Sequence, residues 1–275
     1  MKSFLRTKDF TVTGEEFELL YDESLQMLVT KPQPQNLDKY YSNETYISHT
    51  DARKTFIDKL YQNIKRFSLW KKVRLVRKYS PYGKTLLDVG AGTGDFLLKA
   101  KNNKWGIEGV EPNFIAKRRA QTKGIELRPD LKDLEGNKYD VITLWHVLEH
   151  LPNLDKQIIQ LVSLLTAKGT LVIAVPNFNS YDAKKYGKFW AAYDVPRHLW
   201  HFSKDSIEKI FSEHGMKVIK VKPMIFDSFY VSLLSEKYRK GRNNYFKAFS
   251  IGLMSNIAAW RTKEYSSQIY ILKRA

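Results

Sequence analysis

The sequence predicts an α/β fold in which a parallel sheet carries helices on both faces. From residue 85 onward, short apolar runs of strand length alternate with helical or loop segments long enough for crossover connections. The run Leu86–Val89 continues into a glycine-rich loop and then a helix, which brings backbone amides to a ligand at the carboxyl edge of such a sheet. The 275 residues are enough to bury a sizeable core in one domain, or in one domain with an appendage.

The individual elements follow from local patterns. Residues 1–50 are expected to be irregular apart from two short strands, 17–21 and 27–30, joined by a turn at 22–24. A helical region at 51–79 is expected to consist of two helices that meet near Phe67, and Pro81 and Gly83 end it. The strands expected after it are 85–89, 107–110, 125–128, 139–144, 171–175, 217–222 and 267–273, with a long helical segment at 226–262. The expected domains are an N-terminal extension, 1–50, and a main domain, 51–275, with an insertion at 178–203.

The composition narrows the class of protein. Hydrophobic residues make up 43% and charged residues 27% of the chain, as in ordinary soluble globular proteins. The absence of cysteine excludes disulfides, cysteine-ligated zinc and a cysteine nucleophile. The N-terminus lacks the apolar core of a signal peptide and no apolar run approaches membrane-spanning length, so a cytoplasmic protein is expected.

The net charge of +17 is compatible with nucleic acid, an anionic membrane surface or an anionic substrate as partner. Basic residues are partly clustered, between Lys65 and Lys78 and again between Lys237 and Arg242. The first cluster falls on a helix with apolar residues at helical spacing, which favours a solvated, lysine-rich surface over a specific partner.

Gly90, Gly92 and Gly94 define the loop after the first strand of the main domain. The dinucleotide-binding pattern G-x-G-x-x-G requires its third glycine at position 95, where this chain has Asp95. A carboxylate beside a helix N-terminus is a poor neighbour for a pyrophosphate, which argues against an NAD-dependent enzyme. The loop favours a nucleoside ligand without phosphates, and S-adenosylmethionine is the candidate. Asp88, at the end of the strand, either holds the loop amides, meets the ammonium group of the ligand or only braces the loop.

Carboxylates follow the next two strands. Glu111 ends the second strand about 20 residues after the glycine loop begins, where a carboxylate accepts hydrogen bonds from both ribose hydroxyls. Asp130 follows the third strand and is a candidate to accept from the adenine amino group, with Leu131 against the ring. Asp133 competes for that role, and a plain loop aspartate is the alternative for both.

The fourth strand leads into Trp145 and His146, which emerge beside the position expected for a reactive methyl group. Glu149 and His150 fall on the following helical turn. His146 and His150 are four residues apart, as in a metal-binding pair, but the sequence shows no evident third ligand, so no metal is expected. The more ordinary role of His150 is to hold a helix end or a loop.

An aromatic and polar insertion, 178–203, follows the fifth strand. It is expected to hang over the ligand as a lid whose aromatic side chains enclose an acceptor and exclude water, or else to form a small satellite core under a long loop. The substrate-side candidates in it are Trp190, Tyr193, Asp194, Arg197, His198 and Trp200.

Taken together, these motifs resemble the class I S-adenosylmethionine-dependent methyltransferases over residues 80–275. The resemblance rests on LLDVGAGTGDF, GVEPN, YDVITLWHVLEHLPN, GTLVIAVPN and SSQIYILKR. The V-L-E-H-L motif is similar to a branch with ubiquinone-pathway-type O-methyltransferases and methyltransferases of bacterial surface sugars and secondary metabolism. DVPRHLWHFS resembles a D-x-P-R-H-x-x-x-F-S segment of that branch. The resemblance implies a Rossmann-like, seven-stranded, mostly parallel sheet in the order 3-2-1-4-5-7-6, with the last strand antiparallel.

The resemblance also implies roles for site residues. Asp88, the three glycines and Glu111 would hold S-adenosylmethionine, Asp130 would approach adenine, and Trp145 and His146 would line the methionine end. The P-x-P segment and tyrosines of residues 27–41 resemble the sequel to a small zinc ribbon in some relatives. Tyr21 and Ser24 stand at C-x-x-C spacing without thiols, so such a ribbon has no metal.

The expected reaction transfers a methyl group from a sulfonium to an oxygen or nitrogen of a small-molecule, sugar-linked or lipid-linked acceptor, and positioning does most of the work. His146 or His198 is the candidate base for an acceptor proton. Two alternatives stay open: an RNA-directed methyltransferase or RNA-binding protein that uses the basic surface, and a non-catalytic cofactor-binding module. The segment 226–262 either touches a membrane surface with a lipid-linked acceptor, packs on the sheet or forms a dimer contact. Both a monomer and a homodimer are compatible with the sequence.

Overall fold

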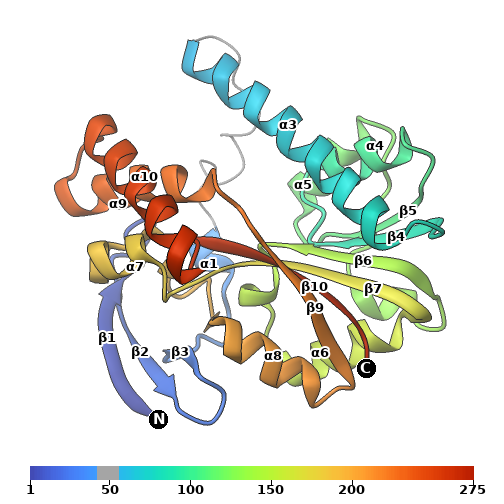
Figure 1. Ribbon diagram of the computed structural model, residues 1–275, viewed down its shortest axis with the longest axis horizontal. Coiled ribbons are helices and arrows are strands. Elements are labelled where there is room, and N and C mark those ends of the chain that lie inside the picture. The colour runs from blue at the N-terminus through green and yellow to red at the C-terminus, as the bar shows by residue number, and fades with distance from the viewer. Residues whose placement is uncertain (42–55) are drawn as a thin grey trace. The chain divides into compact units, whose positions relative to one another are not determined.

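The computed structural model describes residues 1–41 and 56–275 (Figure 1). Contacts between residues divide the chain into two compact units. Among the described residues, 1–41, 146–154 and 174–270 form one unit, called the N-terminal unit below. The other, called the glycine-loop unit, contains 56–145, 155–173 and 271–275. The chain thus passes between the units several times rather than once near residue 50.

The larger sheet has six strands in the order β5-β4-β6-β7-β10-β9. Their bounds are β4 Thr85–Val89, β5 Gly106–Val110, β6 Tyr139–Trp145, β7 Leu165–Pro176, β9 Met216–Pro223 and β10 Ser267–Arg274. β4 runs parallel to both β5 and β6. Leu86 and Leu87 of β4 and Val141 and Ile142 of β6 are fully buried, as expected for parallel strands covered on both faces. The expected α/β class with a mostly parallel sheet is confirmed.

The expected strand 125–128 is not formed. Arg128 makes an isolated bridge with Val110, in which its N–H donates to Gly109 O and its carbonyl accepts from Glu111 N–H. Pro129 follows at once and has no N–H with which to extend the ladder. The expected third strand, at one edge of the sheet, is therefore absent. The remaining strands stand in the expected order, 2-1-4-5-7-6.

The helices described in the glycine-loop unit are α3 Phe56–Tyr79, α4 Asp95–Lys101, α5 Phe114–Gln121, α6 Leu154–Ser163, of which 155–163 belong to this unit, and the 3-10 turn η1 Leu131–Leu134. Two helices were expected where Figure 1 shows one continuous α3. The segment contains neither proline nor glycine, so nothing interrupts its backbone hydrogen bonds near Phe67. Residues 51–55 of that expected region lie outside the described residues.

A second sheet lies in the N-terminal unit, in the order β1-β2-β3-β8. Its strands are β1 Lys2–Lys8, β2 Glu16–Asp22, β3 Met27–Lys31 and β8 Trp200–His201. β2 and β3 match the two expected strands. The rest of residues 1–50 was expected to be irregular, and this was wrong for β1. β1 is mostly exposed and lacks the alternation of apolar and polar residues by which a strand is predicted. Leu28 and Val29 of β3 pair with His201 and Trp200, so the N-terminal strands meet the end of the insertion.

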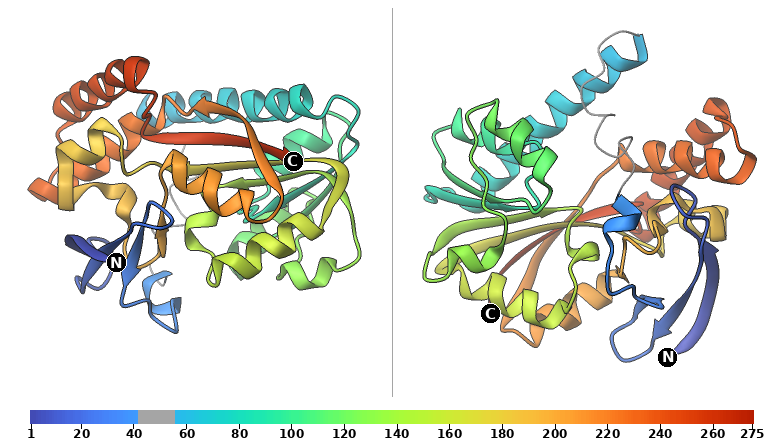
Figure 2. Two further views of the ribbon diagram at one scale, coloured as in Figure 1. Left: turned by 60° about the horizontal axis from the view of Figure 1, so that its bottom comes forward. Right: turned by 180° about the vertical axis from the view of Figure 1, so that it is seen from behind.

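The N-terminal unit also contains helices. They are α1 Asp38–Tyr41, α7 Tyr181–Tyr186, α8 Lys204–Ser212, α9 Asp227–Lys240 and α10 Tyr245–Thr262, with the 3-10 turns η2 Leu148–His150, η3 Gly187–Phe189 and η4 Ala191–Tyr193. The expected helical segment 226–262 is the pair α9 and α10, which lie side by side (Figure 2). Phe17, Leu19 and Leu28 of the strands pack with Trp190 and Tyr193 of the insertion in one core. No helix within residues 1–41 and 56–275 has the length and apolar character needed to cross a membrane.

Candidate functional site

The loop after β4 adopts a conformation that requires its glycines. Gly90, Gly92 and Gly94 have φ angles of 68°, 54° and 74°, in the left-handed region that glycine enters without strain. A Cβ at Gly94 would lie 3.1 Å from the Cβ of Ala120, whereas a Cβ at Gly92 would meet no described atom within 4 Å. Gly94 is therefore needed for packing at the start of α4, and Gly92 borders open space in which a ligand can reach the backbone.

Glu111 directly follows β5 and is buried. Its Oε2 accepts a hydrogen bond from Gly92 N–H at 2.8 Å, and its Oε1 accepts one from Asn113 N–H at 2.9 Å. A carboxylate has about four acceptor positions, so about two are left for a ligand. The structure thus brings the glycine loop and Glu111 together, as the sequence predicted.

Asp88, in β4, accepts a 2.6 Å hydrogen bond from Thr143 Oγ1 of β6. Burial raises the pKa of its carboxyl to about 7, although the Thr143 bond and the positive charge of Lys72 act in the opposite direction. The loop amides bond to Glu111 and to the carbonyls of Val110 and Ala91 instead of to Asp88. Lys72 comes from α3, and no sequence pattern indicated that it acts on Asp88.

Asp95, the first residue of α4, is held between two lysines. Lys65 Nζ lies 2.6 Å and Lys123 Nζ 2.7 Å from its carboxylate oxygens. Burial raises the pKa of Asp95, but these two ion pairs outweigh burial and lower it. Its negative charge is therefore compensated within the unit. The glycine spacing still differs from the dinucleotide-binding pattern, whereas Asp95 repels a phosphate less than expected because two lysines neutralise it.

Asp130 and Asp133 both cap the short turn η1. The Asp130 side chain accepts from Lys132 N–H at 2.9 Å, and Asp133 accepts from Asp130 N–H at 3.4 Å. Both aspartates are exposed, while Leu131 between them is buried. Each carboxylate thus has a local structural role, and contact of either with adenine stays a prediction.

Trp145 ends β6 and packs within the glycine-loop unit. Its ring meets Phe96 edge-on at 5.5 Å between centroids, and Lys72 Nζ lies 4.3 Å from the ring centroid. The indole N–H is buried and has no acceptor among the described residues. A buried donor without a partner is uncommon, and it marks a place where a bound molecule can supply the acceptor.

His146 follows Trp145 and lies between two carboxylates. Its Nε2 is 3.0 Å from Asp227 Oδ2, and its Nδ1 is 3.4 Å from Glu149 Oε1. Burial lowers the pKa of the imidazole, but Asp227 and Glu149 together raise it to about 10. The ring is therefore protonated at neutral pH. Its φ of 59° is strained for a residue with a side chain. Asp227, at the start of α9, was missed because nothing local in the sequence connects it with His146.

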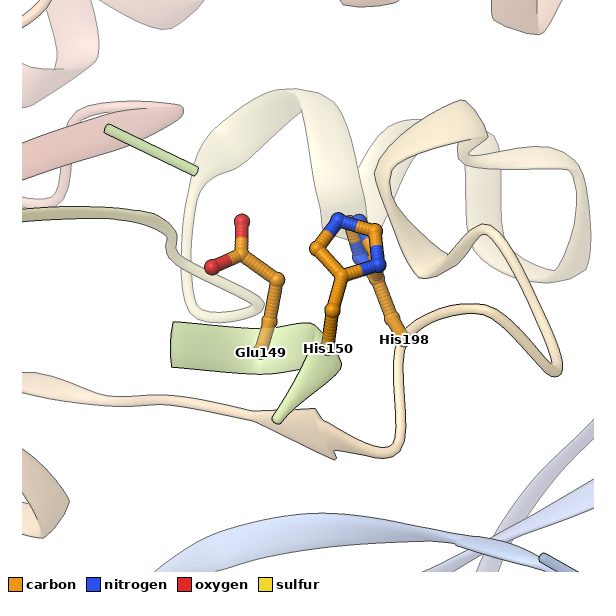
Figure 3. Close-up of side chains that lie close together, drawn as sticks. All are labelled: Glu149, His150 and His198. Carbon is orange, nitrogen blue, oxygen red and sulfur yellow. The ribbon is translucent and has the colours of Figure 1, made fainter. Parts of the chain in front are cut away.

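Glu149, His150 and His198 form a cluster in the N-terminal unit (Figure 3). One ligand atom of each lies within 4.8 Å of those of the other two. The Nδ1 atoms bond to backbone carbonyls, that of His150 to Arg197 O at 3.0 Å and that of His198 to Ala192 O at 2.9 Å. Glu149 is fully buried, and neither of its oxygens accepts a hydrogen bond from a described residue.

One carboxylate and two imidazoles are a donor set that can bind a divalent metal ion. The partners differ from those weighed in the sequence, because His150 is joined by Glu149 and His198, whereas His146 is engaged by Asp227. The protonated ring of His146 already balances the charge of Glu149, so the geometry does not require an ion. The expectation that no metal takes part stays a prediction.

Arg197 and Asp194 of the insertion belong to a buried ion-pair network. The Arg197 guanidinium lies 2.6 Å from Asp194 Oδ1 and 3.0 Å from Asp9 Oδ1, and it donates to Tyr40 O at 3.0 Å. Arg197 is 1% exposed. Burial favours the neutral form of Asp9, but Arg197 and backbone amides hold the pKa of this carboxyl far below its usual range. These two residues therefore join the insertion to the N-terminal segment that contains Asp9 and Tyr40, a partnership that the sequence did not indicate.

Trp190, Trp200 and Tyr193, the three aromatic candidates of the insertion, also have partners within the protein. Trp190 Nε1–H donates to Asp182 at 2.7 Å, and Trp200 Nε1–H donates to Leu151 O at 2.8 Å. Trp190 and Tyr193 are buried and meet edge-on at 4.9 Å. The insertion thus forms a packed core in this structure. A small core was one of the two arrangements expected from the sequence, and a lid over the ligand was the other. Contact of its side chains with an acceptor stays a prediction.

Sequence comparison identifies relatives of the chain. Residues 56–221 match the family described as "Methyltransferase domain". Over 157 residues the chain is 28% identical to a ubiquinone biosynthesis O-methyltransferase of Rickettsia canadensis, with 52% of this chain and 66% of that protein covered. A protein of the same name from Rickettsia prowazekii is 27% identical, with 52% and 62% covered. The chain thus aligns with less than two thirds of the length of these relatives.

The fold is similar to that of several solved structures. Magnesium protoporphyrin IX methyltransferase from Synechocystis, with bound SAH, gives a TM-score of 0.58 at 17% identity, with 88% of this chain and 100% of that chain covered. A possible histamine N-methyltransferase from Thermotoga maritima gives 0.53 at 16% identity, with 80% and 97% covered. At these identities the likeness shows the fold. Because the family match spans more than half of the chain and includes the glycine loop and Glu111, the protein belongs to the methyltransferase-domain family.

Proposed function

We propose that this protein is an S-adenosylmethionine-dependent methyltransferase. The observation that carries the proposal is the hydrogen bond from Gly92 N–H to Glu111, which ties an open glycine loop to a carboxylate with acceptor positions to spare. A nucleoside ligand uses both features, since its ribose hydroxyls donate to the carboxylate and its body lies against the bare backbone. Membership of the methyltransferase-domain family supports the same cofactor.

The other residues of the glycine-loop unit suit the rest of this cofactor. Asp88 offers a carboxyl that a cationic ligand would hold in its ionised form, and Trp145 offers an indole N–H without an acceptor among the described residues. Asp130 and Leu131 are the proposed adenine contacts, with Asp133 as the alternative. S-adenosylmethionine supplies an activated methyl group, so the chain contributes mainly binding and orientation.

Of the two proposed bases, His198 is the one whose ring is neutral. Burial and the nearby charge of His150 lower the pKa of His198 well below its usual value, so its ring is neutral. Its Nδ1 bonds to a backbone carbonyl, which leaves the Nε2 lone pair to accept a proton. By contrast, His146 is held protonated between Asp227 and Glu149, so the role proposed for it is a fixed positive charge.

The proposed acceptor is an oxygen or nitrogen of a small molecule, or of a sugar-linked or lipid-linked molecule. RNA is the less supported alternative, because part of the basic cluster on α3 is used inside the unit. Lys65 pairs with Asp95 and Lys72 lies over the Trp145 ring. The proposed location is the cytoplasm, at the periphery of an anionic membrane, and a monomer or a homodimer is compatible with it.

A labelling experiment tests the proposal. Purified protein is incubated with S-adenosylmethionine carrying a radioactive methyl group and with a bacterial cell extract, which is then divided into lipid, RNA and soluble small-molecule fractions. We expect label in the lipid or small-molecule fraction, and we expect it to be lost with Glu111→Gln. Label confined to RNA would favour the alternative acceptor. Tight cofactor binding without label in any fraction would favour a non-catalytic module.

A further inference from the structure

Helix α10 exposes an apolar stripe. Phe246, Phe249, Leu253, Ile257 and Trp260 follow one another at intervals of three or four residues, which places them on one side of the helix. All five are exposed, Phe246 to 83% and Trp260 to 66%. Single exposed apolar residues are ordinary, but a continuous row along a whole helix marks an interaction surface.

The opposite side of α10 is already occupied inside the N-terminal unit. Ser255 donates to Asp182 at 2.6 Å, and Ser228 of α9 donates to Gly252 O at 3.1 Å. Gly252 allows a close approach, because a Cβ there would lie 2.8 Å from the ring of Phe229 in α9. Of the stripe, Phe249 also takes part in this packing, because its ring stacks on that of Phe229 at 5.3 Å between centroids. Phe246 and Trp260, the two most exposed residues of the stripe, are the part that is open to another partner.

The charges around the stripe are of one sign. Between residues 237 and 263 the chain has seven Lys or Arg and no Asp or Glu. Lys237 and Lys240 are exposed in the last turn of α9, and Arg242 is exposed in the turn before α10. Lys263 follows the last residue of α10. Arg239 is the member of this set that pairs with an acid, Glu236, at 3.0 Å. An apolar helix face with basic flanks matches the surface of an anionic bilayer, in which acyl chains receive the apolar side chains and headgroups receive the cations.

We propose that the stripe of α10 docks in the plane of an anionic lipid surface. The inner side of the helix stays packed on α9 while Phe246 and Trp260 enter the boundary between headgroups and acyl chains. A second copy of this chain is a poorer occupant, because two such faces would bring two sets of unneutralised cations together. The inference does not depend on the acceptor or on methyl transfer, since docking uses no residue of the glycine-loop unit.

Vesicle binding by the full chain tests the inference. Protein is sedimented with vesicles of phosphatidylcholine alone or of phosphatidylcholine mixed with phosphatidylglycerol, at low and at high salt. We expect binding to the mixed vesicles, weaker binding at high salt and little binding to phosphatidylcholine alone. The double variant Phe246→Ser/Trp260→Ser is expected to bind roughly tenfold more weakly or worse, because it removes the two most exposed apolar anchors. Lys240→Gln and Arg242→Gln are each expected to weaken binding about fivefold.

Matched variants elsewhere act as controls. Tyr82→Ser removes an aromatic ring that is 94% exposed, and Lys132→Gln removes an exposed cation, both in the glycine-loop unit. Neither is expected to change vesicle binding. Every variant is checked for cooperative unfolding, so that loss of binding is not loss of structure. The inference is wrong if the wild-type protein does not bind mixed vesicles, or if the α10 variants bind as well as it does. It is also wrong if sedimentation equilibrium shows a dimer that Phe246→Ser/Trp260→Ser dissociates, because the stripe would then be covered by a second copy.

Discussion

Replacing Glu111 by glutamine tests the proposed cofactor site directly. The carboxylate now accepts from two backbone amides, Gly92 N–H and Asn113 N–H, one on each oxygen. Glutamine keeps one oxygen and replaces the other by NH₂, so it can satisfy only one of these donors. The unsatisfied amide would cost about 1–3 kcal/mol, and a ribose hydroxyl would lose a charged acceptor.

The loss of affinity can be estimated from these contacts. A hydrogen bond to a charged group contributes about 1.5–3 kcal/mol. If one such bond to the ribose is lost, the dissociation constant of S-adenosylhomocysteine should rise roughly 10- to 150-fold. Release of the Gly92 amide adds to this effect by loosening the loop that receives the ligand.

Isothermal titration calorimetry with S-adenosylhomocysteine measures this change. Glu108→Gln is the matched control, because Glu108 lies in β5, which Glu111 directly follows, but accepts a hydrogen bond from Tyr139 OH instead of from the glycine loop. The control is expected to bind the ligand within about twofold of wild type. If Glu111→Gln also binds within that range, Glu111 does not hold the ribose and the assignment of this loop is refuted.

Three further changes test the electrostatics of the two units. Arg197→Met leaves the buried carboxylates of Asp9 and Asp194 without their cation, and we expect it to lower the free energy of unfolding, measured by urea titration, by about 3–5 kcal/mol. A decrease below about 1 kcal/mol would contradict a stabilising role for this ion-pair network. Burial raises the pKa of Asp88 from 3.8 to about 7, so the stability that its protonated carboxyl contributes is complete below pH 3.8 and is lost as the pH rises through 7. We expect the melting temperature of Asp88→Asn to vary less with pH over this range than that of wild type. An identical pH dependence in both proteins would contradict the shifted pKa. We expect dialysis against a chelator to leave the rate of methyl transfer unchanged. The opposite result would be a loss of activity that a divalent cation restores in wild type but not in Glu149→Gln. That result would show that the cluster of Glu149, His150 and His198 holds a required ion.

The sequence predicted the site best where the functional residues lie within a short stretch of chain. The glycines at 90, 92 and 94 predicted a loop that presents backbone amides to a ligand, and the spacing of Glu111 predicted a carboxylate for the same ligand. In the structure the three glycines have left-handed backbone, and Gly92 N–H donates to Glu111. Both features depend on neighbours within one β-α-β segment, so spacing alone was sufficient. The missed strand β1 shows the limit of the same approach, because an exposed edge strand has no apolar alternation to detect.

The sequence was least informative where charges from distant segments meet. Nothing near His146 indicates that Asp227 would lie against its ring, and nothing near Arg197 indicates Asp9. These contacts decide which histidine is protonated and why the insertion holds buried charges. The spacing of residue types therefore predicts which side chains can bind a ligand or transfer a proton. Their protonation states depend on contacts with distant segments, such as that of His146 with Asp227, which spacing does not reveal.

The pairing of β3 with β8 has a consequence for the order in which the protein is made. Leu28 and Val29 leave the ribosome long before Trp200 and His201, with which they pair. Until the insertion has been synthesised, the edge of β3 is open and the apolar side chains behind it lack their partners, which is the condition that favours pairing with other chains. β3 can therefore pair with β8 only after most of the glycine-loop unit has been synthesised, and until then its open edge depends on other protection.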